Sequence, residues 1–492
     1  MLQAMRSAYF LALFALVPVG IFASCASTQT AVARDAGGAG DASVDSKTGV
    51  DRELLPEVAP PPFDGKVAPL FCDLPGSLVF QKSGNVIIAG GNGAAPSLSW
   101  LTLPAGFCLH YFAHVNLTRQ MRFAPGGELF VASPSTPTAG GAGSVPGTGG
   151  LGAIVVLADD NHDGYADGDV FPHSDGSQQS LSLFENGLAS TQGMMFAPGY
   201  FYYEDTVPGD MNVGAGIKRI PYKSGQRVAS GTPELIANIT VYPSTVHWPK
   251  TLDMADDGTI FVGNGGDQYQ VCNADVFPRP FTGGILSIGG ATDPVGGTPI
   301  AEGFRNPIAV RCQHGHDLCF STELALDGSG GSGGREKLVA IHKGDDWGFP
   351  CCATANMAYP EVSGTPNCSH VATEPVSFVI GDTPFGLDFE PGLWPEPYKN
   401  DIFVALHGAV GSWIGARVVA IPTQANGMPV TTSDLGPTNM TSFATGWDDG
   451  LLDPQQGRPA AIEFASDGRV FIGNDVSGDI FWIAPVGLKT NW

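Results

Sequence analysis

Two residues in the segment STVHWPKTLDMADDG could take part in proton transfer or anion binding. His247 stands immediately before an expected strand, and Lys250 follows three residues later. An imidazole titrates near neutral pH, so His247 could serve as a general base. Because the chain contains 10 histidines, an exposed loop histidine is the alternative interpretation.

Arginines precede two other expected strands. Arg305 and Asn306 lie in AEGFRNPIAVRC, and Arg458 lies in QQGRPAAIEF. A guanidinium group can bind an anionic cofactor through two parallel hydrogen bonds. For Arg305, the alternative interpretation is a purely structural turn fixed by Pro307, and it stays open. His407 follows the strand-like segment DIFVAL and is expected at the opposite edge or in a loop that lines a channel.

A run of oxygen-bearing side chains resembles the first part of a calcium-binding loop. The candidate ligands are Asp159, Asn161, Asp163 and Asp167, with Gly164 at the turn. The bidentate glutamate that usually ends such a loop is missing, because a valine takes its place. A Ca²⁺ site and an ordinary Asx-rich turn therefore both stay open.

An internal repeat must position these residues. Each copy is a short apolar strand, a turn with Gly or Asp-Gly, and a strand rich in aromatic and β-branched residues. Copies begin at Met121, Gly193, Leu252, Ile308 and Ile462, with a looser one at residue 387. Their turns are about 60 to 80 residues apart, which accommodates four short strands and their loops.

The repeat predicts an all-β fold, a six-bladed β-propeller with four-stranded antiparallel blades. The earlier segment LVFQKSGNVIIAGG, from Leu78, is expected as an extra strand pair, as part of the closing blade or as a seventh blade. A sandwich or barrel with hairpins that resemble one another by chance is the alternative.

Composition agrees with a turn-rich fold. The 492 residues include 67 Gly and 39 Pro, and 43% are hydrophobic while only 15% are charged. These values exclude a long helical bundle and disorder of the whole chain. The formal net charge of −24 argues against nucleic-acid binding and against adhesion to anionic lipid.

The N-terminal region has the pattern of an export signal. Residues 1–25 contain Arg6, an apolar run from Tyr9 to Ala23, and Cys25 in a setting that resembles a bacterial lipoprotein processing site. Ordinary signal cleavage and a retained anchor are the alternatives. Residues 26–65 are rich in Ala, Gly, Asp and Pro and are expected to form a disordered tether. Residues 66–492 are expected to form a single propeller domain.

Export implies an oxidising compartment, either the periplasm or cell surface for a lipoprotein or the outside for a secreted protein. The eight cysteines after Cys25 therefore favour disulfides over a zinc site. A Cys312–Cys319 pair is expected, because the six residues between them could turn a hairpin. Adjacent Cys351 and Cys352 are expected to have separate partners.

Six segments together resemble the soluble quinoprotein glucose/sorbosone dehydrogenase family, the PQQ-dependent aldose dehydrogenases with a six-bladed propeller. They are LTLPAGFCLHYFA, HWPKTLDMADDGTIFVGNGGD, EGFRNPIAV, KGDDWGFP, FVALHG and GRPAAIEFASDGRVFIGND. The resemblance implies that His247 takes a proton from the sugar C1 hydroxyl while hydride passes to PQQ. It also implies that Arg305, Asn306 and Arg458 contact this tricarboxylate cofactor, with Lys250 and His407 as further candidates.

The chain departs from the family pattern after the GFRNP segment. The family there has a short loop whose carbonyls help to hold Ca²⁺, whereas this chain has the Gly-rich STELALDGSGGSGGREKLVAIHKG with Glu323, Asp327 and Glu336. The calcium site is thus either rebuilt or absent. Ile308 also stands where some members use a polar cofactor contact.

The sequence therefore predicts an enzyme that oxidises a small sugar, alcohol or aldehyde and passes electrons to a respiratory acceptor. The membrane is expected to be reached only through the lipid anchor. A non-catalytic propeller that binds carbohydrate or protein at the cell surface, and a Ca²⁺-dependent lactonase of another six-bladed type, stay open.

Overall fold

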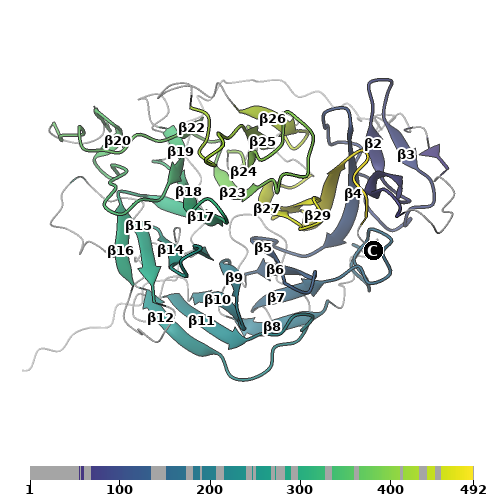
Figure 1. Cartoon of the computed structure of the whole chain (residues 1–492), viewed down its shortest axis with the longest axis horizontal. Helices are drawn as coiled ribbons and strands as arrows, with labels where there is room; N and C mark the ends of the chain where they lie inside the picture. The colour runs from purple at the N-terminus through teal and green to yellow at the C-terminus, as the bar shows by residue number, and fades with distance from the viewer. Residues whose placement is uncertain are drawn as a thin grey trace, which may run out of the picture.

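The computed structural model describes residues 55, 57–59, 68–134, 151–172, 181–188, 191–206, 215–239, 247, 251–266, 272, 283–289, 297–326, 335–359, 365–409, 414–431, 440–448 and 456–490. The predicted leader, Cys25, Lys250 and Asp327 lie outside these residues. Figure 1 shows the sheets arranged in a ring around a common centre.

Five of the sheets in the described chain are antiparallel and have four strands each. Their strands follow one another in sequence: β5 (Met121–Phe123), β6 (Leu129–Ser133), β7 (Gly152–Leu157), β8 (Leu183–Leu188); β9 (Met194–Ala197), β10 (Tyr200–Thr206), β11 (Ala215–Pro221), β12 (Glu234–Ile239); β13 (Leu252–Met254), β14 (Ile260–Asn264), β15 (Gly284–Ile288), β16 (Thr298–Glu302); β17 (Asn306–Gln313), β18 (Leu318–Leu324), β19 (Arg335–Ala340), β22 (Val376–Val379); β23 (Pro384–Phe389), β24 (Ile402–Leu406), β25 (Arg417–Ile421), β26 (Thr441–Ala444). A small hairpin, β20 (Cys352–Thr354) and β21 (Met357–Ala358), is inserted before β22.

The sixth sheet closes the ring with strands from both ends of the fold. Its three C-terminal strands are β27 (Pro459–Phe464), β28 (Val470–Asn474) and β29 (Asp479–Pro485), and its fourth is β4 (Phe107–His114). Yellow β29 lies antiparallel beside blue β4 in Figure 1, with Ile483 opposite Leu109. The predicted six-bladed β-propeller is confirmed.

The segment from Leu78 extends this closing blade and does not form a seventh. β2 (Leu78–Phe80) pairs with β4 and with β3 (Val86–Ile88), and a one-turn 3₁₀ helix, η1 (Phe71–Asp73), precedes them. β1 (Glu57–Val58) pairs in parallel with β3. Part of the segment predicted as a disordered tether, residues 26–65, is therefore a strand, because the free edge of β3 offers it backbone partners.

The hairpin turn of each repeat needs a residue with positive φ. Gly258 and Gly468 follow an aspartate in the copies LDMADDG and IEFASDG and have φ of 86° and 92°. Glycine adopts this region without the steric cost of a Cβ. The glycine at this turn thus lets the chain reverse direction between the first and second strands of a blade.

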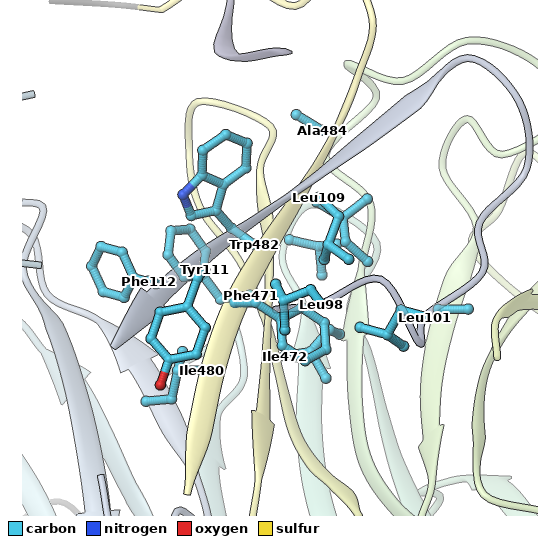
Figure 2. Packing of buried hydrophobic residues seen from close by; sticks show 14 of the residues in the cluster. Leu98, Leu101, Leu109, Tyr111, Phe112, Phe471, Ile472, Ile480, Trp482 and Ala484 are labelled. Carbon is cyan, nitrogen blue, oxygen red and sulfur yellow. The ribbon is translucent and has the colours of Figure 1, made fainter. Parts of the chain in front are cut away.

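Buried side chains fill the space between neighbouring blades. Figure 2 shows the largest cluster around β4, β28 and β29, where Phe112 packs edge-on to Phe471 with ring centroids 5.0 Å apart. Trp482 is fully buried, and its indole N–H donates to Gly164 O at 2.9 Å. These buried residues come from N-terminal β4 and from C-terminal β28 and β29, and they therefore join the two ends of the fold.

Four disulfides stabilise the described chain: Cys72–Cys108, Cys272–Cys351, Cys312–Cys319 and Cys352–Cys368. The predicted Cys312–Cys319 bond is confirmed and links opposed positions of β17 and β18. The separate partners expected for Cys351 and Cys352 are also confirmed. These bonds agree with an oxidising compartment.

The first strands of the six blades contact one another in order and surround the central channel. The second residue of the aligned MRF, LDM, VRC, LDF and IEF triplets is charged in five blades: Arg122, Asp253, Arg311, Asp388 and Glu463. Their side chains meet across the channel. Met195 takes this position in the sixth.

We call these five charged residues the channel network, and Arg311 is at its centre. Its guanidinium lies 2.9 Å from Glu463 Oε2 and 3.7 Å from Asp253 Oδ2, and its Nε donates to Asp388 at 3.2 Å. Arg122 Nη1 lies 3.2 Å from the same Glu463 oxygen. Ion pairs therefore connect the first strands of five blades across the axis.

Among the described residues, no helix has the length and apolar character needed to cross a membrane.

We predict that Arg311→Met lowers the free energy of unfolding by about 3–5 kcal/mol, because it leaves three buried carboxylates without their shared cation. Urea denaturation followed by tryptophan fluorescence measures the change. Lys218→Met is the matched control: its partner Asp205 is 2.7 Å away, but the lysine is partly exposed, so about 1 kcal/mol or less is expected. Equal losses in the two variants would contradict a central role for Arg311.

Candidate active site

The first strands of all blades start at the same end of the channel, so the residues that precede them converge there. Arg119 and Gln120 precede β5, Gln192 precedes β9, and Thr251 precedes β13. These four residues line one cavity together with Phe385 and others. We call this end of the channel the mouth.

His247 and Asn306 lie together at the mouth. The Nδ1 atom of His247 is 2.7 Å from Gly266 O, and both His247 and Asn306 are buried. Because a carbonyl only accepts, Nδ1 carries the proton and Nε2 is the basic nitrogen. Gly265 permits this arrangement: a Cβ there would lie 2.5 Å from His247 Cβ and 3.3 Å from Asn306 Oδ1.

Arg305 directly precedes β17 and is held by the neighbouring strand β18 and by Ala325 just after that strand. Its backbone N–H donates to Glu323 Oε1 at 2.7 Å, and its Nη1 donates to Ala325 O at 2.7 Å. Burial raises the pKa of Glu323 to about 7, while Lys337 and Arg305 oppose this rise. Glu323, which lies in the segment that departs from the family's calcium loop, therefore anchors the turn that carries Arg305 and Asn306.

A second polar cluster joins the mouth ends of the first, fifth and sixth blades. Arg458 donates through Nε to His407 O at 2.9 Å and through Nη2 to Gly408 O at 2.7 Å. His407 Nε2 lies 2.8 Å from Asp475 Oδ2, which also lies 2.7 Å from Arg119 Nη1. Phe385 covers this cluster, with its ring centroid 4.4 Å from that of His407 and 5.3 Å from the Arg119 guanidinium carbon.

Burial and Arg458 lower the pKa of His407 to about 3, although Asp475 opposes this effect. His407 is therefore neutral near pH 7 and donates Nε2–H to the carboxylate. It therefore adds no positive charge to the mouth. Burial likewise lowers the pKa of Arg458, to about 9.

The structure brings the predicted residues into two groups, His247 with Arg305 and Asn306, and Arg458 with His407. Lys250 lies outside the described residues. Sequence reasoning missed Arg119 and Asp475, although the sequence contains a signal for both. Arg119 comes just before the first repeat copy, as Arg458 does before the last, and Asp475 directly follows the strand FIGN.

The acidic run from Asp159 folds as a turn held by its own backbone. Asp159 Oδ1 and Asn161 Oδ1 accept from Asp163 N–H at 3.0 and 2.9 Å, and Asp163 Oδ1 accepts from Tyr165 N–H at 2.9 Å. Asp167 Oδ2 accepts from the backbone of residue 160. This is the bonding of an Asx-rich turn.

Within the described residues, no group of three or more His, Cys, Asp or Glu side chains is arranged to hold a metal ion. Ca²⁺ binding at the Asp159 turn stays a prediction. Glu336, from the segment that departs from the family's calcium loop, accepts hydrogen bonds from the backbone N–H groups of Gly381 and Thr383.

Comparison with known proteins identifies the fold. No family model matches the sequence, and neither does any curated protein. Solved structures do match: the holo form of the PQQ domain of pyranose dehydrogenase from Coprinopsis cinerea has a TM-score of 0.58 at 16% identity, with 80% of this chain and 98% of that chain covered.

Two further structures agree. The iodide structure of the Trichoderma reesei enzyme of carbohydrate-active family AA12 has a TM-score of 0.57 at 16% identity, covering 80% of this chain and 99% of that one. The apo soluble aldose sugar dehydrogenase of Escherichia coli has a TM-score of 0.50 at 12% identity, covering 77% and 99%. The resemblance read from the sequence is therefore confirmed at the level of the fold.

We predict that His407 makes stability fall as the pH is lowered from about 6.5 towards about 3. The unfolded chain then binds a proton at this position and the native chain does not, which amounts to about 2 kcal/mol at pH 5. Urea denaturation at pH 7 and pH 5 should show that His407→Gln removes this loss. The same pH dependence in both proteins would contradict a neutral, buried His407.

Proposed function

We propose that this chain is an exported PQQ-dependent dehydrogenase that oxidises a sugar or a related alcohol or aldehyde. The observation that carries the proposal is the mouth itself, where His247, with Nδ1 fixed by a carbonyl, stands beside the strand start that bears Arg305 and Asn306. The fold is one shared with PQQ-containing and sugar-oxidising proteins.

The residues present fit PQQ. Its three carboxylates call for buried cations, and Arg305 and Arg458 are oriented at the mouth by the carbonyls of Ala325, His407 and Gly408. Within the described part of the chain, Asn306 Oδ1 is buried without a hydrogen-bond partner. This oxygen can accept a hydrogen bond from a ring N–H of the cofactor or from a substrate hydroxyl.

When bound, PQQ would supply the acceptor for the hydride that leaves the substrate carbon. His247 would take the hydroxyl proton of the same substrate on Nε2, because Nδ1–H is engaged with Gly266 O. This hydrogen bond would also stabilise the imidazolium that forms, since its N–H donor becomes charged. Asn306 would position the substrate or the cofactor next to the imidazole.

The four disulfides and the predicted leader support export, with attachment through Cys25 as the proposed anchor. The electrons would then pass to an acceptor outside the cytoplasm. Ca²⁺ is a further proposed cofactor that the described side chains do not by themselves specify.

We predict that PQQ binds the purified protein at micromolar concentrations and confers dye-linked oxidation of aldoses. His247→Ala should lower kcat by about 10²–10⁴-fold, the usual contribution of a general base, with little change in PQQ affinity. Arg458→Gln should instead weaken PQQ binding. Absorbance titration with PQQ, with and without Ca²⁺, separates the two effects.

His314→Ala is the control, because His314 is exposed and pairs with Asp256 at the hairpin-turn end of the blades, away from the mouth. Its activity should match the wild type. Failure of PQQ to bind would refute the proposal, and hydrolysis of lactones that needs Ca²⁺ but no quinone would favour the lactonase alternative.

A further inference from the structure

The small cavity at the mouth extends inward as far as Arg122 and Arg311 of the channel network. Its volume is about 30 Å³. The polar residues that line it all carry hydrogen-bond donors: Arg119, Arg122, Arg311, Gln120, Gln192 and Thr251. The rest of its lining is apolar or glycine, so no carboxylate borders the cavity, although the protein as a whole is acidic.

Arg122 has hydrogen-bond capacity that the described chain does not use. Its side chain is buried, and Nη1 donates to Met121 O at 3.1 Å and to Glu463 at 3.2 Å. Within the described residues, neither Nε nor Nη2 of Arg122 has an acceptor. Buried donors without partners are costly, so an acceptor against this guanidinium would be favourable.

The charged side chains that line the cavity are all cationic, while three carboxylates pair with Arg122 and Arg311 from outside the lining. Arg122 and Arg311 both border it, and after burial itself, the charge of Arg311 is the largest effect that lowers the pKa of Arg122. Their carboxylate partners Glu463, Asp388 and Asp253 are not among the lining residues. An anion in the cavity would be attracted by the two guanidinium groups that border it and repelled more weakly by the three carboxylates, which do not line the cavity.

The size of the cavity limits the occupant. About 30 Å³ is enough for one or two water molecules or a monatomic anion, and it is too small to enclose a sugar or a tricarboxylate cofactor. A water molecule could serve one or two donors but would leave the repulsion between the arginines unchanged.

We propose that this cavity is an anion site that binds chloride or a halide of similar size, with Arg122 as its main ligand. The site lies at the inner end of the mouth, against Arg122 and Arg311, and it does not depend on the proposed dehydrogenase activity. Its effect is structural, because the bound anion would stabilise the centre of the ring.

The test compares sodium chloride with sodium gluconate at constant ionic strength, since gluconate is too large for the cavity. For the wild-type protein we expect Tm to rise saturably with chloride, by about 2–5 °C at high occupancy. Arg122→Gln should abolish the difference between the salts. Arg227→Gln is the control, because Arg227 pairs with Asp160 on the surface and should leave the difference unchanged.

A crystal of the wild-type protein soaked in sodium bromide gives the second measurement, which does not depend on the folding of a variant. An anomalous peak beside Arg122 Nε or Nη2, together with the chloride effect on Tm, would support the site. Equal Tm values in the two salts, or an ordered water molecule without anomalous signal in the cavity, would overturn it.

Discussion

The ion pairs around Arg311 are the interaction on which the rest of the structure depends. A propeller has no single sheet through its middle, so its blades are held by side chains that meet on the axis and by the packing between blades. Here one buried guanidinium contacts Asp253, Asp388 and Glu463 from three different blades. Burying such charges is costly, and their mutual pairing offsets that cost only while all partners are present. The network therefore fixes the blades relative to one another.

This fixed centre is what makes the mouth a precise site. Polar residues from separate blades, such as Arg119, His407 and Asp475, can lie within hydrogen-bond distance only if the first strands keep their spacing. Burial and the neighbouring Arg458 keep His407 neutral. The positive charge at the mouth therefore comes from arginines. Glu323 adds a local support, since it holds the backbone of Arg305 from the neighbouring strand.

Much of this arrangement was predictable from the sequence. The repeat of strand, turn and strand predicted the number of blades, and the spacing of Cys312 and Cys319 predicted one disulfide. The same repeat contains the channel charges, because Arg122 and Glu463 occupy equivalent positions in triplets that are otherwise apolar. The signal was missed because a charge inside a buried strand becomes meaningful only when its partners in other blades are compared with it.

The sequence by itself determined the fold class, the number of repeats and the types of residue available at the starts of the strands, since strand periodicity and turn chemistry are local properties. Only the tertiary structure decided which of those residues meet. Ring closure through β4 and β29 brings Arg119 next to Asp475, 356 positions later in the chain. Contacts of this kind depend on how six blades fit around one axis, and no local stretch of sequence records that fit.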